Sequence, residues 1–453
     1  MPEELLSDDS DQFVGPQIPD TLPEVTKSVE MTATPDRLSQ LHSIDFHHSS
    51  KPLSAICVDN QGVRMTSGSL NGEIKFWEFH GMAHKILPFR NIEHEDLQPI
   101  VSLSYNLSNS HLLIANSGRQ AKVHSRDGVF VLETPKGYTY ISDLSNTNGH
   151  IAAISSACFH PFEDNLFLTS SLDSSVRLWN TDRMEKQASI YKMRGPNGRK
   201  LPVSCASYSN AAKSIAVGLD NGSILVFDTK LSTINAPIHS FENLHEESCG
   251  VNSISFSATD FLMCSRSSDG TCKFIDLRQT NKILKSFDSL PAKYKSVNAA
   301  FDPNSNLLIT SYSDIPQRSS PINKNSSYTN CGIVLIDVAG SFEIIARQKF
   351  TTKVPTLSIW SKKLDQLFVG FSDGTFTGYF DKELYDTDED NADAENCGKR
   401  NRAGLALVSS KYSTDSLNGD YHNSEYIQSG NTCFVIDLSI LLNMRNQKLF
   451  LAN

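Results

Sequence analysis

Histidine, hydroxyl and carboxylate side chains stand at a suggestive spacing in one stretch of the chain. His150 precedes Asp173 by 23 residues, and Thr169 lies between them in the run "GHIAAISSACFHPFEDNLFLTSSLD". A carboxylate that orients an imidazole beside a hydroxyl is the arrangement of a nucleophilic hydrolase triad. Trp179 follows the carboxylate by six residues, in "SSVRLWN". The four side chains are therefore either a catalytic group or a buried hydrogen-bonded set.

The same positions recur along the chain, but other residues replace part of the set. Trp77 keeps the indole, but Asn71 stands at the turn before it. Asp269 follows His245 by 24 residues, but the strand after it ends on Ile275. A catalytic group is needed once, whereas a scaffold group recurs in altered copies of a repeated unit. No phosphate-binding glycine loop, HExxH run or paired-acid motif appears elsewhere. We predict no catalytic residue and no enzyme.

Candidate metal ligands are scattered. His124 occupies the position of the tryptophan in one repeat, and His47 and His48 are adjacent, but no ligand set converges with them in the sequence. The nine cysteines include no CxxC pair and several lie in apolar runs, which predicts buried thiols in a reducing compartment. We predict ordinary packed histidines, no metal and no cofactor.

Composition and charge restrict the partners. The 453 residues carry a formal net charge of −10, which argues against a protein that binds a phosphate backbone. The most basic stretches, 193–200 and 281–295, are predicted to be solvated loops; a rim patch for nucleic acid or an acidic partner is the alternative. No run approaches the ~18 apolar residues that span a bilayer. We expect protein partners, indirect nucleic-acid contact at most, no membrane and no small-molecule substrate.

The elements that position these residues repeat as well. Seven short runs follow a polar turn and end on an aromatic or apolar residue or histidine: 72–79, 120–127, 174–181, 222–229, 270–277, 331–338 and 374–381. Trp179 and Phe227 are 48 residues apart, as are Phe227 and Ile275. Strands that recur at this period, with no helical pattern between them, are typical of a β-propeller.

Each cycle begins with a second kind of strand, alternating apolar and small polar residues: 53–59, 100–106, 154–161, 203–209, 251–257, 297–303 and 355–361. Seven cycles predict an all-β fold, a seven-bladed propeller over residues 41–381. The sixth cycle contains a long insertion at 313–330, which is either disordered or a partner-specific loop.

The remaining segments flank the ring. Residues 1–40 are predicted to be a flexible acidic segment and 382–402 an acidic loop or linker, because both lack enough apolar surface to fold. Residues 403–453 form a C-terminal extension whose apolar run at 433–444 is expected to dock on the propeller or on a partner. A propeller must pair its last open edge, and either 41–48 or 403–412 can supply that strand.

The repeated turn, histidine and tryptophan positions resemble the WD40 repeat. In that family, the turn carboxylate accepts a hydrogen bond from the loop histidine. A hydroxyl residue extends the chain of bonds to the indole N–H. The resemblance implies that His150, Thr169, Asp173 and Trp179 form a structural tetrad, which satisfies the buried polar groups.

A narrower resemblance covers roughly residues 50–381. The runs "GVRMTSGSLNGEIKFWEFHGM", "SGRQAKVHSRDGVFVLETPKGYTYISDLSNTNGH", "DSSVRLWN" and "DLRQTNKILKSFDSLP" are similar to those of the gastrulation defective type of nuclear WD-repeat proteins, the WD repeat-containing protein 70 family. The chain is identified as a divergent member. The resemblance implies a nuclear, non-enzymatic scaffold, a substrate receptor of a cullin-4/DDB1-type ubiquitin ligase in histone H2B ubiquitination and double-strand break repair. The alternative is a structural component of a spliceosome-associated or other RNA-processing complex.

One pair of residues carries the ligase expectation. Receptors of this class often have a Trp-Asp-x-Arg run at the end of a blade, and this chain has Asp276 and Arg278 with Ile275 in the tryptophan position. The alternative is that Arg278 only pairs with Asp276. Family members usually carry a long N-terminal region and a basic Gly/Arg-bearing tail. This chain has about forty residues before the propeller and an acidic-to-apolar tail, so the sequence leaves open whether functions of those regions are retained.

Overall fold

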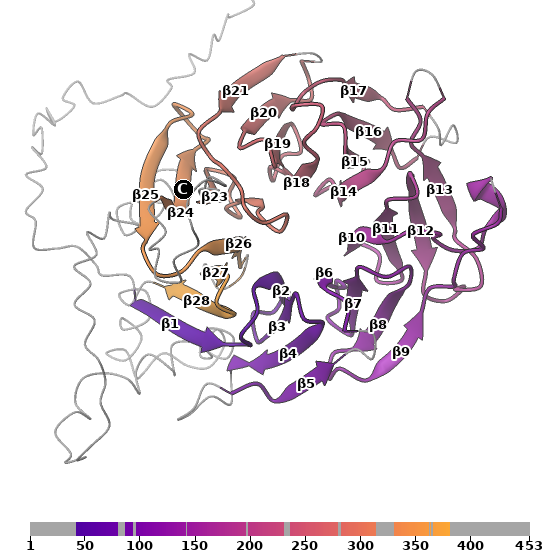
Figure 1. Ribbon diagram of the computed structural model, residues 1–453, viewed down its shortest axis with the longest axis horizontal. Coiled ribbons are helices and arrows are strands. Elements are labelled where there is room, and N and C mark those ends of the chain that lie inside the picture. The colour runs from indigo at the N-terminus through magenta and orange to yellow at the C-terminus, as the bar shows by residue number, and fades with distance from the viewer. Residues whose placement is uncertain are drawn as a thin grey trace, which may run out of the picture. The chain divides into compact units, whose positions relative to one another are not determined.

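Seven antiparallel sheets of four strands each follow one another along the chain (Figure 1). The computed structural model describes residues 42–380 except 80–86, 94–96, 142, 196–197, 231–235, 280–281, 314–329, 362 and 364–365. The only complete helical turn of this described part is the 3-10 helix η2 (Leu144–Asn146). No helix among the described residues is long and apolar enough to cross a membrane.

Each sheet is one blade, with its first strand at the centre of the ring and its fourth strand at the rim. The first two blades contain β2 (Leu53–Val58), β3 (Arg64–Ser69), β4 (Glu73–Glu78) and β5 (Arg90–Glu93), then β6 (Ile100–Tyr105), β7 (His111–Asn116), β8 (Ala121–Ser125) and β9 (Phe130–Glu133). The third and fourth contain β10 (Ile154–Phe159), β11 (Leu166–Ser171), β12 (Ser175–Asn180) and β13 (Ser189–Lys192), then β14 (Val203–Tyr208), β15 (Ser214–Leu219), β16 (Ile224–Asp228) and β17 (His239–Phe241).

The last three blades follow the same order. They contain β18 (Val251–Phe256), β19 (Leu262–Ser267), β20 (Cys272–Asp276) and β21 (Ile283–Phe287); β22 (Ala299–Phe301), β23 (Leu307–Ser313), β24 (Cys331–Asp337) and β25 (Ile344–Phe350); and β26 (Pro355–Trp360), β27 (Leu367–Phe371), β28 (Thr375–Phe380) and β1 (His42–His47).

The blades form a closed ring. The innermost strands β2, β6, β10, β14, β18, β22 and β26 each contact the next, and β26 contacts β2 (Figure 1). The predicted all-β, seven-bladed propeller is therefore confirmed. Every first and third strand lies within the range expected for it from the sequence.

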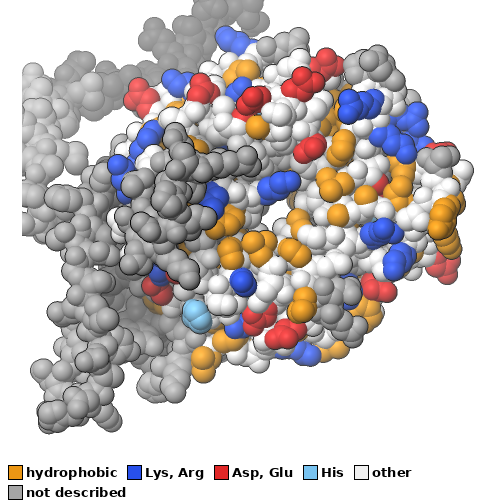
Figure 2. Space-filling model, in the orientation of Figure 1, with side chains coloured by type: hydrophobic (Ala, Val, Ile, Leu, Met, Phe, Trp, Pro, Cys, Tyr) orange, Lys and Arg blue, Asp and Glu red, His pale blue; other side chains and the backbone are white. Residues whose placement is uncertain are grey.

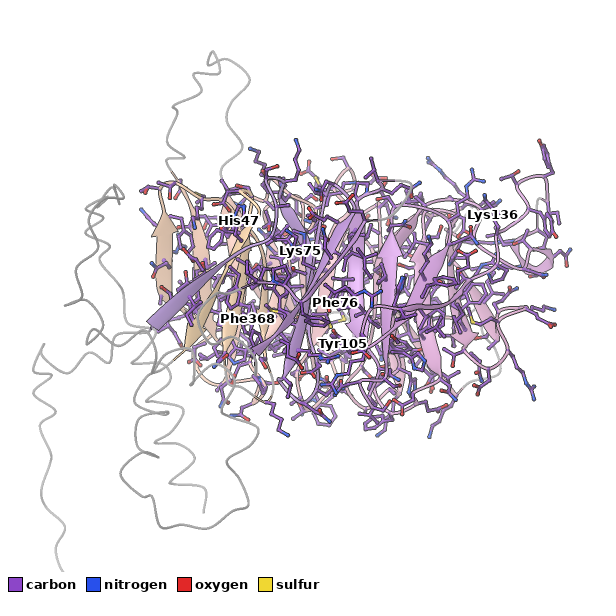
Figure 3. All side chains as sticks on the ribbon, turned by 90° about the horizontal axis from the view of Figure 1, so that it is seen from below. His47, Lys75, Phe76, Tyr105, Lys136 and Phe368 are labelled. Carbon is purple, nitrogen blue, oxygen red and sulfur yellow. The ribbon has the colours of Figure 1, made fainter. Side chains whose placement is uncertain are left out.

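The core lies between the blades. Second strands such as β11 are buried along almost their whole length, because neighbouring blades cover both of their faces. Small residues let the blades approach closely: a Cβ at Gly68 would come within 2.7 Å of the Ile100 side chain in the next blade. In the side view of Figure 3, Phe76 and Phe368 lie in the interior, whereas His47 and Lys136 lie toward one face.

That face carries the turns between second and third strands, such as Asp173–Ser174 and Asp269–Gly270, and we call it the turn face. The third strands end at the opposite, far face, since Asp276 pairs with Leu262 at the start of β19. Fourth strands run back, so that Lys192 at the end of β13 pairs with Ser175, beside the turn. The topology thus assigns each loop to one of two faces.

The strand that closes the ring comes from the N-terminal side. β1 pairs antiparallel with β28 along its whole length, from His42 opposite Phe380 to His47 opposite Thr375. Phe46 is buried and stacks on Phe376, and its edge meets Trp77 of the first blade. Of the two segments that the sequence offered for this role, the structure uses 42–47. Residues 403–412 lie outside the described part, as do the acidic segments at 1–40 and 382–402 and the extension to 453.

Three smaller expectations have different outcomes. The basic stretch 281–295 is not only loop, because it includes the outer strand β21, whose backbone pairs with β20. Of the histidine pair, His48 is packed as expected, but His47 is exposed because successive side chains of a strand point to opposite sides. The sixth-blade insertion, 314–329, lies outside the described residues.

Candidate functional site

The structure brings all four predicted tetrad side chains of the third blade together. Asp173 Oδ2 lies 2.9 Å from His150 Nδ1, and Thr169 Oγ1 lies 2.8 Å from His150 Nε2. Trp179 Nε1 donates to the same Thr169 oxygen at 2.7 Å. The histidine comes from the loop before β10, the hydroxyl from β11, the carboxylate from the turn and the indole from β12. One bonded chain therefore joins the turn to the two strands that it connects.

Protonation in this set is fixed by its geometry. Burial acts to raise the pKa of Asp173, but hydrogen bonds from His150 and Ser175 outweigh it and hold the pKa below its usual value. Burial lowers the pKa of His150, despite the carboxylate beside it. A neutral imidazole next to an ionised carboxylate carries its proton on Nδ1, so Nε2 accepts a hydrogen bond from the Thr169 hydroxyl.

This proton arrangement is the same as that of a hydrolase triad, but the hydroxyl is unsuited to attack. Thr169 is fully buried, with no exposed surface. Its proton is donated to His150 and its oxygen accepts the indole N–H of Trp179, so both of its hydrogen bonds belong to the tetrad. A nucleophile must also reach its substrate. The arrangement therefore orders the turn face and offers no reacting atom.

The fifth blade contains a second set of this kind. His245 Nδ1 lies 3.1 Å from Asp269 Oδ2, and its Nε2 lies 2.8 Å from Ser265 Oγ. Ile275, also fully buried, stands where the third blade has its indole. Partial burial acts to raise the pKa of Asp269, but hydrogen bonds from His245 and Thr271 outweigh it and lower that pKa. The chain of hydrogen bonds in the fifth blade therefore lacks the indole that ends it in the third blade.

The first blade contains a third set, which was not predicted from the sequence. His48 Nδ1 lies 2.7 Å from Ser67 Oγ, and Trp77 Nε1 donates to that oxygen at 2.8 Å. Asn71 at the turn replaces the carboxylate and contacts Ser69 instead of the histidine. A signal was present: His48 precedes Asn71 by the 23 residues that also separate His150 from Asp173.

The remaining candidate ligands do not form a site. His124 is buried and lies edge-on to Phe130. Among the described residues, no three His, Cys, Asp or Glu side chains converge as a metal would require. The seven described cysteines are free thiols, of which the buried Cys264 and Cys272 lie 3.4 Å apart between their sulfurs. Cys57, Cys158 and Cys249 depart from the expectation of burial, because each is partly exposed.

Asp276 and Arg278 lie together on the far face. Arg278 donates to both carboxylate oxygens, through Nε at 3.1 Å and Nη2 at 2.9 Å, which holds the pKa of Asp276 below its usual value. The guanidinium also covers the ring of Phe261, 4.9 Å from its centroid. The Arg278 side chain is nevertheless 64% exposed. Arg278 is thus held in place and still presents charge to solvent.

Three segments of the chain match the family described as WD40, "WD domain, G-beta repeat": residues 38–78, 142–180 and 235–276. These segments correspond to the first, third and fifth blades. They are the blades in which a buried histidine bonds to a hydroxyl of the second strand. The match and the hydrogen-bonded sets therefore identify the same repeats.

Curated relatives align with most of the propeller. The chain is 32% identical over 346 residues to the gastrulation defective protein 1 homolog of Drosophila melanogaster, which covers 76% of this chain and 51% of that protein. It is 30% identical over 348 residues to WD repeat-containing protein 70 of Bos taurus, and 30% over 348 residues to that of Homo sapiens. The chain spans about half the length of the curated relatives it matches.

The resemblance seen in the sequence is confirmed at a level of identity that fits a divergent member. The WD40 propeller is typically a non-enzymatic scaffold for protein–protein interactions. The chain is a WD40-repeat protein, homologous through its propeller to WD repeat-containing protein 70 and the gastrulation defective protein 1 homolog.

Proposed function

We propose that this protein is a nuclear scaffold that recruits substrates to a cullin-4/DDB1-type ubiquitin ligase, in histone H2B ubiquitination and the repair of double-strand breaks. The observation that carries the proposal is the exposed Arg278 on the far face. It stands where ligase receptors of the WD40 class carry an arginine at the end of a blade.

The surroundings of Arg278 suit contact with an acidic adaptor. The side chain is oriented by Asp276 below it and by Phe261 beside it, so little side-chain entropy remains to be lost when a partner binds. A guanidinium makes paired, charge-assisted hydrogen bonds to a carboxylate. The Asp276 carboxylate occupies Nε and Nη2, which leaves donors on the outer side of the fork for a second carboxylate.

Affinity purification of the tagged full chain from nuclear extract, with quantitative mass spectrometry, tests the proposal. We expect the DDB1-type adaptor to co-purify, and Arg278→Ala to reduce its recovery at least tenfold. Arg278→Lys should also reduce recovery, because an ammonium cannot make the paired contact. Arg183→Ala, another exposed arginine, is the matched control and should leave recovery unchanged.

Two results would contradict the proposal. One is absence of the adaptor from the wild-type purification. The other is equal recovery with Arg278→Ala and wild type. Recovery of small nuclear ribonucleoprotein subunits in place of the adaptor, resistant to nuclease, would support a role in an RNA-processing complex instead.

A further inference from the structure

A cleft of about 730 Å³ opens at the outer end of the seam between the third and fourth blades. Its floor includes Leu219 and Phe227, which belong to the hydrophobic cluster that packs these two blades together. Leu201 and Leu225 pack against the edge of the same cluster and also line the cleft. Solvent thus reaches the edge of this cluster at Leu201 and Leu225, whereas Leu219 and Phe227 beneath them are buried.

The cleft follows from the shortness of one outer strand. β17 has three residues and pairs only with Ile224–Val226 of β16. Phe227, the next residue of β16, therefore lies beyond the end of this pairing and lines the cleft. The other wall is a hairpin that extends β13, described at 193–195 and 198–201, in which Arg194 bridges to Lys200 and the Gly195 N–H donates to the Arg199 carbonyl. A short strand and a protruding hairpin together leave the opening.

The two walls differ in charge. The hairpin exposes Arg194, Arg199 and Lys200, and none of the three forms an ion pair with any residue that the structure describes. Arg194 lines the cleft itself, whereas the opposite wall contributes a single exposed carboxylate, Glu242. Lys and Arg side chains gather over this part of the ring in Figure 2, where β13, β16 and β17 lie in Figure 1.

We propose that this cleft binds an extended acidic segment of a partner protein, with one apolar side chain of that segment on the leucine-lined floor and its carboxylates beside Arg194, Arg199 and Lys200. Unpaired cations along a rim favour a partner of opposite charge and speed its encounter. The apolar floor supplies the anchor that such interfaces need at their centre. A cleft of this volume is within the range of ~300–1,000 Å³ that accommodates specific ligands.

The site is separate from Arg278. Lys192 and the hairpin stand at the turn face, because Lys192 pairs with Ser175 beside the Asp173 turn. Arg278 follows Asp276 at the far face. The proposal therefore does not depend on a ligase role, and failure of one leaves the other intact.

Selection of a phage library of random twelve-residue peptides on the immobilised full chain tests the cleft. We expect enriched peptides to contain an apolar residue flanked by Asp or Glu. The most enriched sequence, synthesised with a fluorescent label, should bind the wild-type chain, and Arg194→Glu should raise its Kd at least tenfold. Glu242→Lys should lower the Kd several-fold, because it removes the only opposing carboxylate of the lining.

Further variants separate the cleft from the general surface. Ser240→Tyr, at an exposed position of the lining, should block binding by filling the opening without touching the core. Arg183→Ala and Arg278→Ala should leave the Kd unchanged. All variants alter exposed residues, so the midpoint of thermal unfolding should stay within a few degrees of wild type, which excludes misfolding as the cause.

Three outcomes would overturn the proposal. The library yields no enrichment; enriched peptides lack acidic residues; or Arg194→Glu and Ser240→Tyr bind as well as wild type. Binding of a labelled single-stranded RNA that is lost in Arg194→Glu, with no peptide enrichment, would assign the hairpin to nucleic acid and would equally exclude the acidic peptide.

Discussion

In this propeller, histidine, carboxylate and hydroxyl groups of the kind that catalyse reactions in hydrolases form buried hydrogen bonds between strands. His150, Asp173 and Thr169 have the contacts and protonation of a hydrolase triad, but the Thr169 hydroxyl is fully buried and out of reach of a substrate. The recurrence of related sets around His48 and His245 agrees with a role in the repeat and not in a reaction.

Removing the hydroxyl from this chain of bonds should therefore cost stability. Thr169→Val keeps the shape of the side chain but leaves His150 Nε2 and the Trp179 N–H without their bonding partner. We expect the free energy of unfolding, measured with urea, to fall by about 1–3 kcal/mol. Thr181→Val, a threonine at the end of β12 outside the tetrad, is the control. An unchanged stability in Thr169→Val would contradict the structural role.

His48 makes the stability of the protein depend on pH. Burial, with a smaller effect of Lys75, lowers the pKa of His48 from 6.5 to about 4. Between these values the unfolded chain binds more protons than the folded one, so the free energy of unfolding falls as the pH falls from 6.5 to 4. Across the whole window, the loss due to His48 is on the order of 3 kcal/mol.

Urea unfolding at several pH values checks this expectation. His48→Gln should show a shallower dependence between pH 6.5 and 4, by close to one proton in the difference between the two states. His47→Gln, at the exposed neighbouring position, should keep the wild-type slope. Equal slopes in wild type and His48→Gln would show that His48 is not buried in its neutral form.

The sequence predicts the contacts of the tetrad well where all four residue types are present. The third blade retains histidine, hydroxyl, carboxylate and indole, so its resemblance to the WD40 repeat implies that they lie together. In the first blade, Asn71 replaces the carboxylate. The motif is therefore incomplete, and the sequence shows His48 only as one of two adjacent histidines. The bond from His48 to Ser67 depends on the path of the loop after β1, which local spacing does not define.

At the level of elements, β1 is the strand on which the ring depends. It completes the seventh blade beside β28, and Phe46 on it packs on both the seventh and the first blade. The sequence left this assignment open, because 41–48 and 403–412 both resemble an outer strand. Pairing between segments more than 300 residues apart is set by the geometry of the closed ring, not by the local pattern.

Truncation of Phe46 should open that junction. Phe46→Ala removes a ring that stacks on Phe376 and meets Trp77, and we expect the free energy of unfolding to fall by about 3–5 kcal/mol. Hydrogen exchange should increase first in β1 and β28. Val131→Ala, which trims an exposed outer strand of the second blade, is the control. Loss of stability without faster exchange at β1 and β28 would show that the closure is not the weak point.

The cleft between the third and fourth blades also arises at this level. The third strands were predictable because each follows a polar turn, but no such sequence feature precedes the outer strands. The length of β17 therefore has no signal in the sequence, and neither has the opening that results from it.

For the whole molecule, the ring gives two faces that are chemically independent. Hydrogen bonds between adjacent inner strands hold the blades together, as when Ser102 donates to the Ala157 carbonyl at 2.6 Å and Asn298 bonds reciprocally to Ser358. A ring tied in this way is rigid, so a partner on the far face near Arg278 need not disturb one at the turn-face cleft. Such independence suits a scaffold.

Closure by the first strand also constrains how the protein is made. Asp45 of β1 reaches Thr377 of β28 across 332 positions of the chain. A ribosome adds about 5–20 residues per second, so β1 leaves the exit tunnel roughly 15 to 65 s before its partner exists. During that interval its apolar face and unpaired edge are open to wrong neighbours. Only when β28 emerges can β1 pair along its whole length and the ring close.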